Sequence, residues 1–316
     1  MVHLDLDNCQ RCITLPPLGQ FPSLKDLCIR SLYAVKSLGL EFFRDAVSEP
    51  FPALETLEFE DLREWKDWKF PLDVANAIFH RLCKLTITSC PKLAGKLPSH
   101  LPSLEKLVLY RCQQLVVLIP SLPMLNGLMI CGYKELVQTS TIGFSKLDRM
   151  ELSNISKLTC LTEGFMQGLT EVVSGLLFPF LKKVSLFAKL RLLFISCFEK
   201  LEALPNCFHK LASLRRLFIA GYPNIISFPE EGLPPNLTTL ELGGTNICKP
   251  IFKWGVHKLS SLEELTVCRC QDVESFPQEE IGMKLSSSLT QLMIENFPNL
   301  RYLYTGASDT STLWPA

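Results

Sequence analysis

The chain has 316 residues, of which 47% are hydrophobic and only 9% aromatic, and its 32 basic and 32 acidic side chains give a formal net charge of zero. This aliphatic content excludes a disordered chain, and the balanced charge offers no general attraction for nucleic acid. The apolar runs end after a few residues, at Pro120 and Pro179, whereas a bilayer span needs about 20. The first residues do not resemble a signal peptide, and 13 cysteines cannot all pair within one chain. We therefore expect a soluble, cytoplasmic protein that does not insert into membranes.

A pattern of the form Leu-x-x-Leu-x-Leu/Ile recurs along nearly the whole chain. Within each half of the chain, successive copies begin 21 to 30 residues apart, which is the period of leucine-rich repeats. The copies lie at 1–6, 24–29, 54–59, 82–87, 104–109, 125–130, 147–152, 214–219, 237–242, 262–267 and 289–294.

Each copy alternates buried and polar positions, which is typical of a short strand with one buried face. A further apolar residue follows three positions later, for example Cys90 or Cys112, and we expect it inside the turn that ends the strand. Prolines such as Pro98 and Pro205 interrupt the return segments and disfavour long helices there. One repeat cannot bury its own apolar edge, so repeats stack. The predicted fold is an α/β leucine-rich-repeat solenoid, a curved horseshoe with a parallel β-sheet on its concave face and mostly irregular or short-helical convex segments.

One stretch breaks the spacing. The matches Leu181-Val184-Leu186 and Leu190-Leu193-Ile195 begin only nine residues apart, but one repeat needs about 20 residues. We therefore expect about 12 repeats over residues 1–303, irregular near 157–200, with one or two strands in 181–200. Residues 304–316 form a non-repeat C-terminal tail in this interpretation.

Several longer sequence segments resemble those of a known family. They include Leu15-Pro-Pro-Leu-Gly-Gln-Phe-Pro-Ser-Leu-Lys-Asp-Leu27, Glu64-Trp-Lys-Asp-Trp68 and Ser227-Phe-Pro-Glu-Glu-Gly-Leu-Pro-Pro-Asn-Leu237. They resemble the repeat region of plant coiled-coil, nucleotide-binding, leucine-rich-repeat disease-resistance proteins. The sequence has no phosphate-binding loop, because Gly95-Lys96 is followed by Leu97 and lacks the upstream glycine. The chain thus resembles a fragment without the nucleotide-binding domain.

Outward strand positions define the predicted binding face. Acidic residues dominate its first repeats, basic residues follow, and the last repeats are acidic again. Aromatic and arginine side chains are common in protein interfaces. The candidate partner-binding residues are Asp26, Arg30, Glu58, Glu60, Lys84, Lys106, Tyr110, Arg149, Arg216, Phe218, Glu241 and Glu264.

Other motifs are weak indications of metal binding, catalysis or an exposed binding patch. Cys9-x-x-Cys12 could be half of a zinc site, but no second pair has suitable spacing and Cys9 falls on an expected buried position. Cys207 and His209, on an expected extended segment, could suggest a nucleophile and its base, but no catalytic constellation in the sequence rises above background. Trp65 and Trp68 form an exposed patch or, more often for such residues, pack over the sheet edge. We expect no catalytic residues, metal or cofactor.

The resemblance implies a non-catalytic recognition module of an intracellular plant immune receptor. Its partners would be a pathogen effector, a host protein that such effectors modify, or the receptor's own nucleotide-binding domain. An alternative is a leucine-rich-repeat adaptor or scaffold, such as the substrate receptor of a ubiquitin ligase. A secreted or membrane-bound receptor is a third class, but the plant extracellular signature Asn-x-Leu-x-Gly-x-Ile-Pro is absent.

Overall fold

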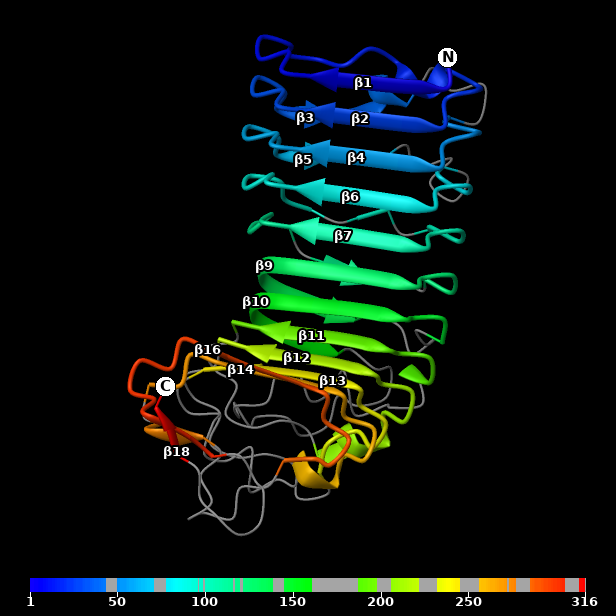
Figure 1. Ribbon diagram of the computed structural model, residues 1–316. Helices are drawn as coiled ribbons and strands as arrows, with labels where there is room; N and C mark the ends of the chain where they lie inside the picture. Colours follow the sequence, from blue (N-terminus) through cyan, green and yellow to red (C-terminus); the bar gives the residue numbers. More distant parts are fainter. Residues whose placement is uncertain are drawn as a thin grey trace, which may run out of the picture. The chain divides into compact units, whose positions relative to one another are not determined.

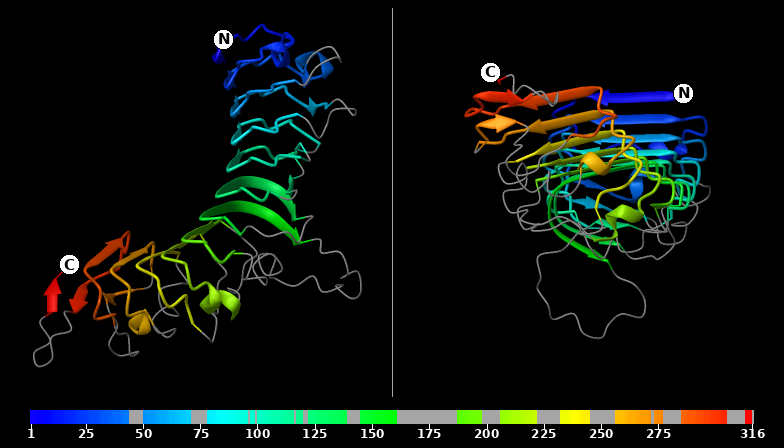
Figure 2. Two further views of the ribbon diagram at one scale, coloured as in Figure 1. Left: turned by 90° about the vertical axis from the view of Figure 1, so that its right-hand side faces the viewer. Right: turned by 60° about the horizontal axis from the view of Figure 1, so that its bottom comes forward.

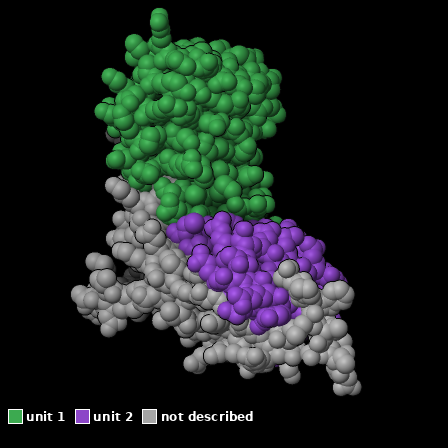
Figure 3. Space-filling view, turned by 60° about the vertical axis from the view of Figure 1, so that its left-hand side comes forward, with its two compact units in different colours: residues 1–170, 185–187 green, residues 171–184, 188–316 purple. Residues whose placement is uncertain are grey.

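The computed structural model divides the chain into two compact units, residues 1–170 with 185–187 and residues 171–184 with 188–316 (Figure 3). It describes residues 1–43, 50–70, 78–95, 97–98, 100–115, 117–119, 122–138, 145–160, 187–197, 206–221, 232–244, 256–271, 273–276, 285–304 and 313–315. Each unit is built around a parallel sheet that receives one strand from each successive repeat.

In the first unit the strands stack in chain order, each beside the previous one (Figure 1). Their registers align the repeats position by position, so that Leu57, Leu85 and Leu107 are direct neighbours. The strands are β1 (His3–Asp7), β2 (Asp26–Arg30), β4 (Thr56–Glu60), β6 (Lys84–Thr88), β7 (Lys106–Tyr110), β9 (Gly127–Gln138) and β10 (Arg149–Cys160). In the second unit they are β11 (Leu192–Ser196), β12 (Arg216–Ala220), β13 (Thr239–Gly243), β14 (Glu264–Cys268) and β16 (Gln291–Glu295).

The second and fourth residues of the inner strands form the core. Leu27, Leu57, Leu85 and Leu107 are at most 1% exposed, and burying such a side chain stabilises the fold by about 1.5–3 kcal/mol. We call this row of stacked core residues the leucine ladder. Its side chains are more exposed at the outermost strands, where Leu292 of β16 is 39% exposed. The predicted leucine-rich-repeat solenoid with a parallel sheet is confirmed, because the alternation that defined the repeats is the alternation of burial.

Short secondary sheets line the return segments. β3 (Ser37–Leu38) pairs with β5 (Asp67–Trp68), and β15 (Ser275–Phe276) pairs with β17 (Tyr302–Tyr304). β8 (Val117–Ile119) instead joins the main sheet by pairing with β9. Helical structure in the described residues consists of single 3₁₀ turns, as expected from the prolines: η1 (Leu18–Gln20), η2 (Leu40–Phe42), η4 (Asn206–Lys210) and η5 (Val256–Lys258).

An aromatic cluster fills the space between β4 and β5. Trp65 is fully buried and Trp68 is 8% exposed, and the ring of Phe59 lies 4.8 Å from Trp65 and 5.3 Å from Trp68 between centroids. Of the two interpretations for these tryptophans, packing against the sheet is therefore the one observed.

Three sequence-based expectations need correction. Tyr133 and Ile155 do not lie in turns, because β9 and β10 continue through them and pair Ile155 with Tyr133; these two strands are the long curved green ribbons of Figure 2. Cys9 is exposed rather than buried. Asn206–Lys210 is a 3₁₀ turn rather than an extended segment. Within the expected non-repeat tail, which stays a prediction, β18 (Leu313–Pro315) pairs antiparallel with β17.

The irregular stretch is partly described. The match Leu190-Leu193-Ile195 provides strand β11, with Leu193 and Ile195 fully buried. The competing match Leu181-Val184-Leu186 lies outside the described residues, as does most of 157–200.

Candidate functional site

The first, third and fifth residues of each strand point away from the core, and we call the surface that they form the open face. In β4, for example, Glu58 is half-buried and Glu60 exposed, while the alternating residues Leu57 and Phe59 are buried. All twelve candidate partner-binding residues occupy such positions: Asp26, Arg30, Glu58, Glu60, Lys84, Lys106, Tyr110, Arg149, Arg216, Phe218, Glu241 and Glu264. Their role in binding stays a prediction.

Charged residues of the open face of the first unit are largely paired across strands. A guanidinium nitrogen of Arg30 lies 3.4 Å from Asp5, and another lies 3.9 Å from Glu60. Lys84 forms an ion pair with Glu58 on the preceding strand. Because these pairs are partly exposed, each contributes at most about 1 kcal/mol to stability. Their main effect is to neutralise the boundary between the acidic and basic repeats.

In the basic repeats beyond that boundary, one cation has no ion pair among the described residues. Arg149 pairs with Glu151 two residues further along its own strand. Lys106 lies on β7, between these pairs, and has no ion pair among the described residues. The basic middle predicted from sequence is therefore reduced to one available positive charge.

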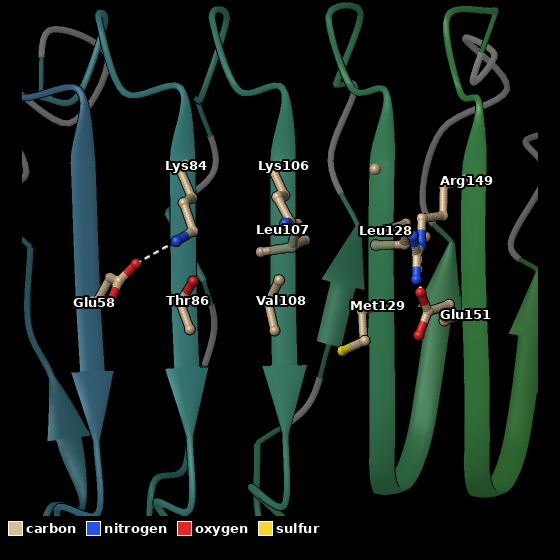
Figure 4. Close-up of a pocket in the computed structure, with 11 residues that line it drawn as sticks. Glu58, Lys84, Thr86, Lys106, Leu107, Val108, Leu128, Met129, Arg149 and Glu151 are labelled. Carbon is tan, nitrogen blue, oxygen red and sulfur yellow. Dashed lines mark hydrogen bonds and ion pairs between the residues drawn. The ribbon is translucent and has the colours of Figure 1, made fainter.

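A hollow of about 400 Å³ opens beside Lys106 (Figure 4). It is lined by residues of β4, β6, β7, β9 and β10, with Val108 and Met129 among its apolar groups. Gly127 occupies the first position of β9, next to Lys106, and a Cβ atom there would meet only Cγ of Lys106, at 3.6 Å. The absent side chain creates the room.

The hydroxyl oxygen of Thr86, also in the lining, is buried and has no hydrogen-bond partner. Buried polar atoms are normally paired, so this atom is an unused hydrogen-bonding group in the wall. A glycine at an outward strand position was the sequence signal that could have located the hollow.

In the second unit, the open face carries an aromatic pair. The rings of Phe194 on β11 and Phe218 on β12 lie 6.0 Å apart between centroids, and the guanidinium carbon of Arg216 lies 5.7 Å from the centre of the Phe218 ring. Phe194 was missed from sequence because two repeat matches only nine residues apart left its strand ambiguous. Glu241 and Glu264 follow on β13 and β14.

Thiols on the open face are not poised to react. Burial and then the Glu58 carboxylate raise the pKa of the Cys28 thiol, whose sulfur lies 3.7 Å from that carboxylate. Burial and then Glu241 raise the pKa of Cys268. A raised pKa keeps both in the unreactive thiol form near neutral pH.

The described residues contain no group of three or more His, Cys, Asp or Glu side chains that could hold a metal ion. Cysteines of the described part with a free thiol include Cys9, Cys12, Cys28, Cys83, Cys90, Cys197 and Cys268, whereas Cys270 is in a disulfide. Among the helices of that part, none is long and apolar enough to cross a membrane. The open face therefore offers charge, aromatic rings and one hollow for non-covalent contacts.

The repeat period, the parallel sheet with one strand per repeat and the leucine ladder define this chain as a leucine-rich-repeat protein. No protein-family model matches it. Two curated relatives do, both from Arabidopsis thaliana. The chain is 41% identical over 118 residues to a protein named as a disease resistance RPP13-like protein, and 38% identical over 115 residues to a second protein named for disease resistance.

Each match covers 35% of this chain, and the chain spans only 11% and 8% of the length of these relatives. About a third of the chain is thus homologous to plant disease-resistance proteins. Similar solved structures include a leucine-rich repeat protein from Bacteroides ovatus, at 11% identity and a TM-score of 0.27, covering 96% of this chain and 82% of that one. Another is the plant peptide hormone receptor RGFR1 in complex with RGF2, at 14% identity and a TM-score of 0.25, covering 96% and 67%.

Proposed function

We propose that this chain is a protein-recognition module of an intracellular plant immune receptor, and that its open face binds the partner without catalysis. The partner is a pathogen effector, a host protein that an effector modifies, or the receptor's own nucleotide-binding domain. The single observation that carries the proposal is homology to disease-resistance proteins over a third of the chain.

The chemistry of the open face supports this role. Arginine and aromatic side chains contribute much of the energy of protein interfaces, and Arg216, Phe194 and Phe218 form such a group in the second unit. In the first unit, the paired charges leave the cation of Lys106 available. Charged groups of this kind steer encounter and select partners more than they add raw affinity.

The test is affinity isolation with the tagged chain from leaf extracts of healthy and infected plants. We expect it to retain a pathogen-derived protein, or a host protein whose retention changes with infection. The combined variant Lys84→Glu, Lys106→Glu and Arg149→Glu should lower that retention by about tenfold, which corresponds to about 1.4 kcal/mol.

The matched control is Lys36→Glu, Lys66→Glu and Lys69→Glu, which reverses three exposed cations around the β3–β5 sheet, away from the open face. It should retain the partner like the unmodified chain. Equal loss in both variants would contradict binding through the open face. Retention of ubiquitin-ligase subunits alone, in healthy and infected extracts alike, would overturn the immune role in favour of an adaptor.

A further inference from the structure

We infer that the hollow beside Gly127 is a pocket for one carboxylate side chain, presented by an acidic segment of a protein partner. This inference rests on the proposed function, because it names the chemical group that the open face of the first unit selects. Three features of the hollow support it: its charge, its shape and its apolar wall.

The charge of the lining matches a single negative charge. Lys84, Lys106 and Arg149 lie in the wall together with Glu58 and Glu151 (Figure 4). Three cations against two carboxylates leave one net positive charge, and the ion pairs assign it to Lys106. A phosphate group or a nucleic acid backbone would bring more negative charge beside Glu58 and Glu151, and like charges at short range are repelled.

The position of Gly127 determines the shape. Lys106, Gly127 and Arg149 occupy the same register position on three successive strands. Since neighbouring strands lie about 4.8 Å apart, Lys106 and Arg149 flank an open space about 10 Å wide at the level of the backbone. A side chain entering at Gly127 would have a cation on each side.

The remaining wall suits the stem of an acidic side chain. Val108 and Met129 present half-buried apolar surface at the third strand position, next to the cations of the first position. The methylene groups of a glutamate would pack on them while its carboxylate faces Lys106.

The probe for the test is a library of short random peptides displayed on phage, selected on the full chain and counter-selected on a Gly127→Leu variant. Gly127 has ordinary negative or extended backbone angles and open space around it, so a leucine fills the hollow without forcing the backbone. We expect the enriched peptides to share a Glu or Asp at one position. Replacing that residue with Gln or Asn should weaken binding about tenfold or more.

A double-mutant cycle then assigns the contact. Lys106→Met should weaken binding of the acidic peptide by a similar factor, and it should have little further effect on the peptide that already carries the amide. Thermal unfolding of Gly127→Leu and Lys106→Met monitors the fold. Lys69→Met, an exposed lysine away from the open face, is the matched control and should leave peptide binding unchanged.

The pocket would be overturned by enriched peptides without a shared acidic residue, by additive effects in the cycle, by equal binding to Gly127→Leu, or by the absence of enrichment. These failures are distinguishable from failure of the proposed function. If the tagged chain still retains an infection-dependent protein from leaf extract, recognition stands and occurs elsewhere on the molecule. Selection of phosphate-bearing ligands over carboxylates in a competition assay would also exclude the pocket as described.

Discussion

The backbone N–H of Ser31 donates to the carbonyl oxygen of Glu60 at 2.9 Å, joining the end of β2 to the end of β4. Ser31 has φ 55°, and the same left-handed geometry recurs directly after many strands, for example at Asp61, Ser89 and Arg269. Each of these residues donates to the last residue of the next strand. The left-handed residue therefore ends the exposed row of one repeat and links it to the next.

Glycine at this position should stabilise the fold. A Cβ atom in the left-handed region costs about 1–2 kcal/mol, and glycine removes that cost while adding entropy to the unfolded chain. Arg269→Gly is expected to raise the free energy of unfolding by up to about 1 kcal/mol, measured by urea denaturation.

The converse change, Gly221→Val, places a branched side chain at φ 72°, with its Cβ 3.0 Å from Cys197 Sγ. It should lower stability by about 2 kcal/mol. Stabilisation by Gly221→Val would contradict the strain argument.

The leucine ladder gives a second prediction with an internal control. Leu107 and Leu292 occupy the same position in their repeats, but Leu107 is 1% exposed and Leu292 is 39% exposed. Leu107→Ala should cost about 2–5 kcal/mol because it leaves a cavity. Leu292→Ala should cost under about 1 kcal/mol, because its site is already open to water. Equal losses of unfolding free energy in the two variants would show that Leu292 is covered in solution.

The repeat and its core were predictable because they depend on local alternation. Leu85 and Ile87 fall on the buried side of β6 for the same reason that they fit the pattern. The open face was predictable only as a set of positions. Lys84 at the first position of β6 pairs with Glu58 at the third position of β4, and the repeat pattern does not determine which neighbouring charge a side chain contacts.

The long strands were missed for a related reason. β9 turns at Gly132, with φ 78°, and β10 at Asn154, with φ 49°, as other repeats do, but both strands then continue. The residues after these turns pair with one another, so neighbouring chain segments rather than local propensity determine the strand length. The position of Phe194 was likewise not predictable, because choosing between two closely spaced matches requires knowledge of the neighbouring strand.

Two thiols in the core give a third prediction. Cys90 and Cys112 follow β6 and β7 and are completely buried. A side-chain hydrogen bond with Cys112, together with burial, raises the pKa of Cys90 far above the ordinary thiol value. Since the thiolate is the reactive form, Cys90 should resist iodoacetamide at mildly alkaline pH in the folded chain and react after denaturation. Cys9 and Cys197 are exposed and should be alkylated first, as mass spectrometry of digested samples would measure. Early labelling of Cys90 would mean that this part of the core opens readily.

Asp61 gives a prediction about acid stability. The Arg63 guanidinium, at 2.9 Å, is the main cause that lowers the pKa of its carboxyl below the ordinary 3.8, and a hydrogen bond from the Tyr33 hydroxyl adds to it. A group whose pKa is lowered by folding stabilises the fold fully above its ordinary pKa, and this contribution is lost as pH falls through the lower, folded value.

Asp61→Asn keeps the side-chain shape, and asparagine tolerates the left-handed φ of 54°. The variant should therefore be slightly less stable than the unmodified chain at pH 6, and the difference should shrink as the pH falls below 3.8. Urea denaturation at a series of pH values measures this difference, and a gap that stays constant down to pH 2 would show that the ion pair with Arg63 does not contribute.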